Sequence, residues 1–278
     1  MDFESASRVA PAITPAPGSV GGEVGSSMIF PRHAVTPPSR AEAPPQEPSA
    51  ANSPGRVGCE AVVETLGLPK RPQSFGEEIA NGVSHGVGLL AAMGATPVLV
   101  LRAVRRGGVA DIVGASVFAA TILLLYLTST LYHVLPRNRA KGVFRVLDHG
   151  AIFFLIAGTY TPFTLGVLRG TWGWTLLGLI WGLAAAGVIL KALGGVRHPV
   201  LSTCLYLGMG WLVIVAVRPL WLRMPLSGLL WLLVGGLAYT AGVAFFAAER
   251  IRYSHLIWHL FVLAGTACHF IAVLRYAA

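Results

Sequence analysis

The chain has 278 residues, of which 54% are hydrophobic and only 12% are charged. Soluble domains carry roughly 25% charged residues, so this composition argues against a soluble enzyme and indicates an integral membrane protein. Up to Gln73 the chain holds six Lys or Arg and seven Asp or Glu, and beyond it fifteen and five. The net charge of +9 therefore belongs to the apolar part, where basic residues face anionic lipid head groups rather than nucleic acid.

The first 72 residues differ in composition from the rest of the chain. They hold twelve of the eighteen prolines, and no apolar stretch among them is long enough to pack or to insert into lipid. This composition predicts a disordered tail rich in Pro, Ala and Ser over residues 1–72. The tail also lacks the apolar run of about 7–15 residues that marks a secretory signal peptide. We therefore expect the first hydrophobic run to direct the chain to the membrane.

From Glu78 onward, charged residues divide the chain into seven uncharged runs of 20 to 25 residues. A helix needs roughly 20 residues to cross a 30 Å hydrocarbon core, and the runs lack the alternating polarity of barrel strands. The sequence predicts an all-α integral membrane protein, a seven-transmembrane helix bundle over residues 73–278. The expected spans are 79–101, 112–136, 149–168, 170–190, 198–217, 224–248 and 253–274.

Basic residues near the ends of these spans predict the orientation. Ten Lys or Arg lie on the side of the tail and seven on the opposite side. Cytoplasmic loops carry the excess of Lys and Arg, so this asymmetry favours a cytoplasmic N-terminus. The missing signal peptide favours the same orientation.

Polar residues are concentrated at four helix ends that seven spans place on one side of the membrane. These are the start of the first helix, the end of the second, and the starts of the third and seventh. Ionisable groups within spans are costly and usually mark a site or a polar cavity. The residues are Glu78, Asn81, His85, Ser129, His133, Asp148, His149, His255 and His259.

His255 and His259 are four residues apart, which places both imidazoles on one helical face. This separation suits two ligands of one tetrahedral ion, although two solvated histidines at a helix end would show the same spacing. His133, on another helix, offers a third imidazole four residues after Ser129. Three histidines with one open position are typical of a catalytic rather than a structural zinc site.

Asp148 has two interpretations. It marks the start of the third helix, where the helix dipole favours a carboxylate, or it lies beside a metal and deprotonates water. In the second case Ser129 donates a hydrogen bond to that water or to a developing oxyanion. A Ser129, His133, Asp148 triad is the competing enzyme hypothesis. It ranks lower because it leaves His255 and His259 without a role.

Other polar residues have structural interpretations. Glu78 and Asn81 flank the first helical turn, where such side chains commonly cap exposed N–H groups. His269, ten residues beyond His259, lies near the middle of the membrane, and we expect it to form a hydrogen bond between helices rather than to act as a fourth ligand. His85, one turn deeper than Asn81, is not explained by capping.

Four separated stretches form a recognisable pattern: EEIANGVSH at 77–85, STLYH at 129–133, LDH at 147–149 followed by AGTYTPF at 157–163, and HLIWH at 255–259 followed by HF at 269–270. Together they resemble the hemolysin III family of bacterial membrane proteins, within the superfamily of progestin and adiponectin receptors and alkaline ceramidases. The resemblance covers about residues 74–278. It implies a Zn²⁺ ion held by His133, His255 and His259, with Ser129 and Asp148 near its water.

The resemblance also directs the functional hypotheses. In the superfamily such a site supports hydrolysis of lipid amide bonds in some members, whereas the family name implies lysis of red cells. We predict a multi-pass protein of the bacterial inner (plasma) membrane that acts on or senses membrane lipids. If it is an enzyme, the expected reaction is zinc-dependent hydrolysis of a lipid amide or ester, with Asp148 as general base. The alternatives are a pore-forming cytolysin or channel with a structural zinc ion, and a sensor of lipid composition. Membrane lipids are the expected partners, and no soluble protein partner or oligomeric state can be inferred.

Overall fold

The computed structural model describes residues 71–194 and 199–277, so almost all of the predicted tail over 1–72 lies outside the described residues. Within the described part the chain is helical, with no strand, and seven helical spans are long and apolar enough to cross a membrane. The predicted seven-span, all-α fold is confirmed. The elements are α2 (Phe75–Arg106), α3 (Val109–Val134), α4 (Arg139–Pro162), η1 (Phe163–Leu168), α5 (Thr171–Gly194), α6 (Pro199–Trp211), η2 (Leu212–Ala216), α7 (Val217–Arg223), α8 (Leu226–Ala247) and α9 (Ser254–Tyr276).

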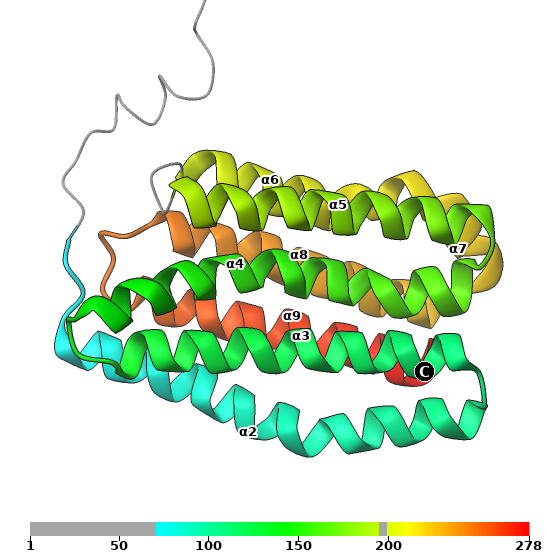
Figure 1. The fold of residues 1–278 in the computed structure, drawn as a ribbon, viewed down its shortest axis with the longest axis horizontal. Helices are drawn as coiled ribbons and strands as arrows, with labels where there is room; N and C mark the ends of the chain where they lie inside the picture. Colours follow the sequence, from blue (N-terminus) through cyan, green and yellow to red (C-terminus); the bar gives the residue numbers. More distant parts are fainter. Residues whose placement is uncertain (1–70, 195–198, 278) are drawn as a thin grey trace, which may run out of the picture. The chain divides into compact units, whose positions relative to one another are not determined.

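The helices run side by side, and successive spans reverse direction (Figure 1). Helix α3 packs between α2 and α4, and α9 packs against both α8 and α2. The starts of α2, α4 and α9 and the end of α3 therefore meet at one end of the bundle, at the left of Figure 1. We call it the histidine end, after His85, His133, His149, His255 and His259. The other is the far end.

Helix α2 begins four residues before the predicted span because a capping box starts it. The Ser74 hydroxyl accepts a hydrogen bond from the Glu77 backbone N–H at 3.4 Å, and the Glu77 carboxylate accepts one from the Ser74 N–H at 2.9 Å. These two bonds satisfy donors that a helix start otherwise leaves unpaired. Glu78 is therefore not the cap of this helix.

Helix α4 begins ten residues before the predicted third span. The Asn138 side chain caps it by accepting a hydrogen bond from the Lys141 N–H at 3.0 Å. The first turns of α4 contain charged residues, so the prediction from uncharged runs did not include them in the span. As a result, Asp148 lies more than two turns inside a helix rather than at its start.

Two spans contain irregular segments that Tyr160 joins. The third span changes to a π-helix after Pro162, and the fifth changes to a 3₁₀-helix after Trp211. The Tyr160 hydroxyl accepts a hydrogen bond from the Val213 N–H at 2.8 Å and lies 2.8 Å from the Met209 carbonyl oxygen, to which it donates. Unpaired backbone groups are costly in lipid, so this side chain stabilises the break in the fifth span.

Helices α3 and α4 approach closely at Gly158. A Cβ atom at this position would lie 2.8 Å from the Thr121 Cβ, closer than real Cβ atoms approach their neighbours. Phe118, one turn before Thr121 on α3, is fully buried. The close packing fixes α3 relative to α4, and therefore His133 relative to Asp148.

Candidate metal centre

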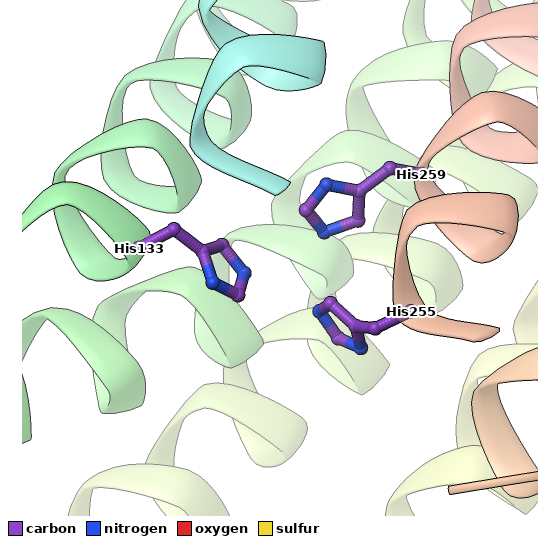
Figure 2. A group of neighbouring side chains, drawn as sticks. All are labelled: His133, His255 and His259. Carbon is purple, nitrogen blue, oxygen red and sulfur yellow. The ribbon is translucent and has the colours of Figure 1, made fainter. Parts of the chain in front are cut away.

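Three histidines from two helices lie together at the histidine end (Figure 2). His133 belongs to the last turn of α3, and His255 and His259 to the first two turns of α9. One ring nitrogen from each lies within 4.8 Å of the other two. His133 and His259 are buried, and His255 is half-buried. This group could hold a metal ion.

Glu78 orients the ring of His133. The His133 Nδ1 lies 2.9 Å from the Glu78 Oε2, and because a carboxylate accepts, the ring donates its Nδ1 proton. This leaves Nε2 as the atom with a lone pair, and it is buried without a hydrogen-bond partner among the described residues. Metal-binding histidines commonly donate their second N–H to a carboxylate in this way. The Nε2 of His133 is therefore suited to bind a metal ion.

Helix α2 orients His259 in a similar way. The His259 Nδ1 lies 3.2 Å from the Asn81 carbonyl oxygen and 3.0 Å from the Ser84 Oγ. A carbonyl oxygen only accepts, so Nδ1 carries the proton and Nε2 keeps its lone pair. The Nε2 of His255 is buried and has no partner within the described part of the chain. The donor set of His133, His255 and His259 therefore fits an ion that prefers imidazole nitrogen, such as zinc.

Asp148 is buried in α4 with 8% of its surface exposed. Its carboxyl interacts with the Ser129 hydroxyl, and its Oδ2 lies 3.7 Å from the Nδ1 of His149. The favourable effect of a helix N-terminus falls off within the first turn. The helix-start interpretation of Asp148 is therefore wrong, and its burial requires another explanation.

Ser129 is fully buried and pairs with His85. The Ser129 Oγ lies 2.7 Å from the His85 Nδ1, and the His85 ring stacks on His259 with the ring centroids 3.6 Å apart. The competing triad of Ser129, His133 and Asp148 is not assembled, because His133 pairs with Glu78 and Ser129 with His85 and Asp148. His85 instead joins Ser129 to the three-histidine group.

Glu78 and Lys141 form hydrogen bonds at this end of the bundle that the sequence did not predict. The capping interpretation of Glu78 is wrong, because its Oε2 accepts hydrogen bonds from His133 and, at 3.1 Å, from the Lys141 Nζ. Lys141 also donates to the Tyr132 carbonyl oxygen at 2.8 Å, near the end of α3. Both are charged residues at the same end as the histidines, which is the only signal that could have found them.

Glu77 connects the start of α2 to the loop before α9. Its carboxylate accepts hydrogen bonds from Arg71 and, at 2.8 Å, from the Tyr253 backbone N–H. This bond with Glu77 raises the pKa of the Arg71 guanidinium. Tyr253 has a left-handed backbone with φ of 59° and immediately precedes α9. Glu77 therefore helps to fix the helix start that carries His255.

The interpretation of His269 as an interhelical residue is confirmed. Its Nε2 donates to the Leu232 carbonyl oxygen of α8 at 3.1 Å. His269 is not one of the three residues in the metal-capable group.

A cavity of about 120 Å³ extends from the histidines into the bundle between α3, α4, α6, α8 and α9. At the histidine end its wall includes Ser129, Asp148, His255 and His259. Its deeper walls are mainly apolar. A second apolar cavity of about 300 Å³ adjoins it and shares Tyr160, among other residues, with the first. The deeper wall of the first cavity includes Leu125, Ile152, Leu155, Trp211, Val243 and Val262.

The fold and this site define a multi-pass membrane protein with a candidate metal centre at one end of a seven-helix bundle. Residues 73–270 match the family model described as Haemolysin-III related. The chain belongs to the haemolysin III family, which confirms the resemblance found in the four sequence stretches.

Its relatives include bacterial and animal proteins. The chain is 45% identical over 200 residues to the "Hemolysin-3 homolog" of Bacillus subtilis (strain 168), covering 72% of this chain and 94% of that protein. It is 44% identical over 209 residues to "Hemolysin-3" of Bacillus cereus, covering 75% and 95%. The human "Monocyte to macrophage differentiation factor" is 31% identical over 175 residues, covering 58% and 69%.

Proposed function

We propose that His133, His255 and His259 bind a zinc ion and that the chain hydrolyses an acyl amide or ester bond of a membrane lipid. The observation that carries this proposal is the cavity, in which Asp148 and Ser129 lie at the histidine end of a mainly apolar channel. Such a channel accommodates an acyl chain, while the polar end receives the bond to be cleaved. Imidazole ligands also suit copper, iron and nickel. Zinc is favoured because it performs hydrolysis without redox chemistry.

The residues of the chain divide the work of this reaction. When bound, zinc supplies a Lewis acid that polarises a carbonyl and makes water a better nucleophile near neutral pH. The Asp148 carboxylate accepts a proton from the attacking water and later returns it to the leaving group. The Ser129 hydroxyl, which interacts with Asp148 and lies 2.7 Å from the His85 Nδ1, orients that carboxylate. The apolar walls keep other water away from the reacting bond.

The same proposal includes a place in the cell. We place the chain in the bacterial inner membrane with its N-terminus and histidine end on the cytoplasmic side. The bacterial relatives and the ten basic residues near that side, against seven on the other, support this orientation. We expect a signal from a reporter that is active only in the periplasm when it is fused to the C-terminus. A signal from a reporter that is active only in the cytoplasm would contradict this orientation.

The hydrolysis is tested on detergent-purified full-length protein with ceramide and diacyl phospholipids, by mass spectrometry of released fatty acid. We expect release that requires zinc. Asp148→Asn is expected to lower the rate by about 10²–10⁴-fold while zinc content is retained, because only the proton acceptor is lost. The matched control is Asp111→Asn at the far end, where the carboxylate lies 3.6 Å from Arg169 and outside the cavity. Full activity of Asp148→Asn would contradict the proposal.

The name of the Bacillus cereus relative denotes lysis of red cells. The same preparation is therefore added to liposomes that contain a fluorescent dye. If the chain is a hydrolase, any release of dye should be accompanied by cleaved lipid. Zinc-dependent dye release with chemically intact lipid would instead support the pore hypothesis.

A further inference from the structure

A second, wider opening lies at the histidine end. It has a volume of about 660 Å³ and is lined by the start of α2, the turn between α3 and α4, the end of α5, the start of α6 and the loop before α9. We call it the vestibule. It shares His149, Tyr206, Phe246 and His255 with the apolar cavity. The vestibule therefore adjoins the cavity beside the candidate metal centre.

Basic side chains outnumber acidic ones in the vestibule. Two of the basic side chains are already paired, Arg71 with Glu77 and Lys141 with Glu78. Glu249, near the end of α8, is the third acidic residue of the lining. The described lining holds five basic residues against these three, namely Arg71, Arg137, Lys141, Arg145 and Lys191. The vestibule therefore has an excess of positive charge.

Three of the basic residues lack an acidic partner. Within 71–194 and 199–277, no carboxylate lies within ion-pair distance of Arg137, Arg145 or Lys191. Arg137 and Arg145 are exposed, as expected of solvated arginines. Lys191 differs from them, because only 2% of its surface is exposed.

Burial without a partner makes Lys191 informative. Lysine is almost never fully buried unless it is paired, because removing an ammonium group from water is costly. A lysine near a helix end normally extends its ammonium to water past lipid, whereas Lys191 is enclosed by protein and lines the vestibule. The adjoining residues 195–198 contain no Asp or Glu in sequence. Lys191 therefore places a positive charge without an acidic partner on the wall of the vestibule, where it favours an anion.

We propose that the vestibule binds a phosphate group, with Lys191 and Arg145 as its main contacts. Arg and Lys both form strong charge-assisted hydrogen bonds with phosphate oxygens. Because the vestibule adjoins the apolar cavity, the phosphate of a lipid whose chain enters that cavity fits both compartments. A free phosphate compound offers the same chemistry to the vestibule alone. The lipid assignment rests on the proposed function, whereas the anion site does not.

The test measures binding rather than hydrolysis. The probes are an ether-linked phosphatidic acid, which has no acyl bond to cleave, and the matched dialkylglycerol, which lacks the phosphate. Both are titrated onto the zinc-loaded full-length protein and counted by native mass spectrometry. We expect the phosphatidic acid to bind at least about tenfold more tightly. A failed hydrolysis assay would leave this result unaffected, so the two proposals are tested separately.

Variants assign the binding to the vestibule. Lys191→Gln is expected to weaken binding of the phosphatidic acid at least about tenfold, and Lys191→Arg to restore most of it. Arg145→Gln, at an exposed position, is expected to weaken it as well. The matched control is Arg102→Gln, which removes one charge from an exposed position at the far end and should leave binding unchanged.

The remaining outcomes are decisive. Competition by inorganic phosphate at equal strength would support the anion site and assign it to free phosphate compounds, and absence of competition would assign it to lipid. Equal binding of the two ether lipids, or wild-type binding by both Lys191→Gln and Arg145→Gln, would overturn the proposal.

Discussion

The ionisable side chains of the histidine end and the buried threonines in the middle of the bundle satisfy their hydrogen bonds in different ways. In the middle, buried threonines donate within their own helix, as Thr159 does to the Leu155 carbonyl oxygen at 2.8 Å and Thr161 to that of Ala157 at 2.9 Å. At the histidine end, ionisable side chains pair across helices. The Glu78 carboxylate of α2 holds His133 of α3.

This difference separates structure from function. A hydroxyl that donates a hydrogen bond within its own helix is satisfied before helices associate, so it needs no partner on a neighbouring helix. Ionisable groups within a membrane are costly and are typically retained at functional sites. Buried ionisable groups such as Asp148 and Lys191 are therefore the ones for which we propose a reaction or a ligand. The following changes test this contrast, from the largest expected effect to the smallest.

Removal of a ligand from the candidate metal centre should have the largest effect. We expect near-stoichiometric zinc in the wild-type chain and its loss in both His133→Ala and His255→Ala, because each change removes an imidazole from a three-ligand site. Plasma mass spectrometry of detergent-purified protein measures the metal per chain. His269→Ala, a change of a half-buried histidine in the middle of the bundle, should retain zinc. Wild-type protein without metal, purified away from chelators, would contradict the three-histidine site.

Removal of the carboxylate behind a ligand should have a smaller effect. Glu78→Gln is expected to lower zinc affinity by about 10–100-fold, because a neutral amide orients His133 less firmly and makes it a weaker ligand. Titration against a chromophoric chelator measures the affinity. Asp111→Asn at the far end provides the control. Equal affinities for wild type and Glu78→Gln would show that the bond between Glu78 and His133 is only structural.

A change in the middle of the bundle should reverse this pattern. Gly158→Ala is expected to reduce the free energy of unfolding by about 1–3 kcal/mol, because the new Cβ would overlap Thr121. Zinc content should stay unchanged. Gly178→Ala is the control, since a Cβ there meets nothing within 4 Å. Unfolding in detergent, followed by circular dichroism, measures the difference.

Loss of the cap of α2 should have the smallest effect. Ser74→Ala removes one acceptor and is expected to destabilise the chain by about 1 kcal/mol, whereas Ser74→Thr retains an acceptor and should resemble wild type. The same unfolding measurement compares the two. A loss of zinc in Ser74→Ala would show that the metal centre depends on the start of α2 more strongly than expected.

The sequence was sufficient for the number of spans but not for their limits. Charge-free runs identify the lipid-facing length of each helix, yet α4 continues through charged residues back to Arg139. That extension changes the meaning of Asp148 from a helix start to a buried interior carboxyl. The rule fails here because a helix that projects into water can carry charge.

The site could be predicted only where local spacing carries the signal. Four-residue spacing brought His255 and His259 to one face, and the four helix ends brought His133 near them. The roles of Glu78 and Ser84 could not be predicted, because Glu78 meets a residue 55 positions away and Ser84 one 175 positions away. Such pairs depend on the rotation and depth of α2 against its neighbours, which packing decides.

One oxygen atom belongs to both the metal centre and the vestibule. The Glu78 Oε2 accepts from the His133 Nδ1 at 2.9 Å and from the Lys141 Nζ at 3.1 Å. An anion bound at Lys191 and Arg145 that also drew Lys141 away would leave more negative charge for His133 and would make that imidazole a better ligand. Linkage would make the effect reciprocal, so a bound metal would raise the affinity for the anion by the same factor. Cooperative loading of the two ligands is the expected consequence of this shared atom.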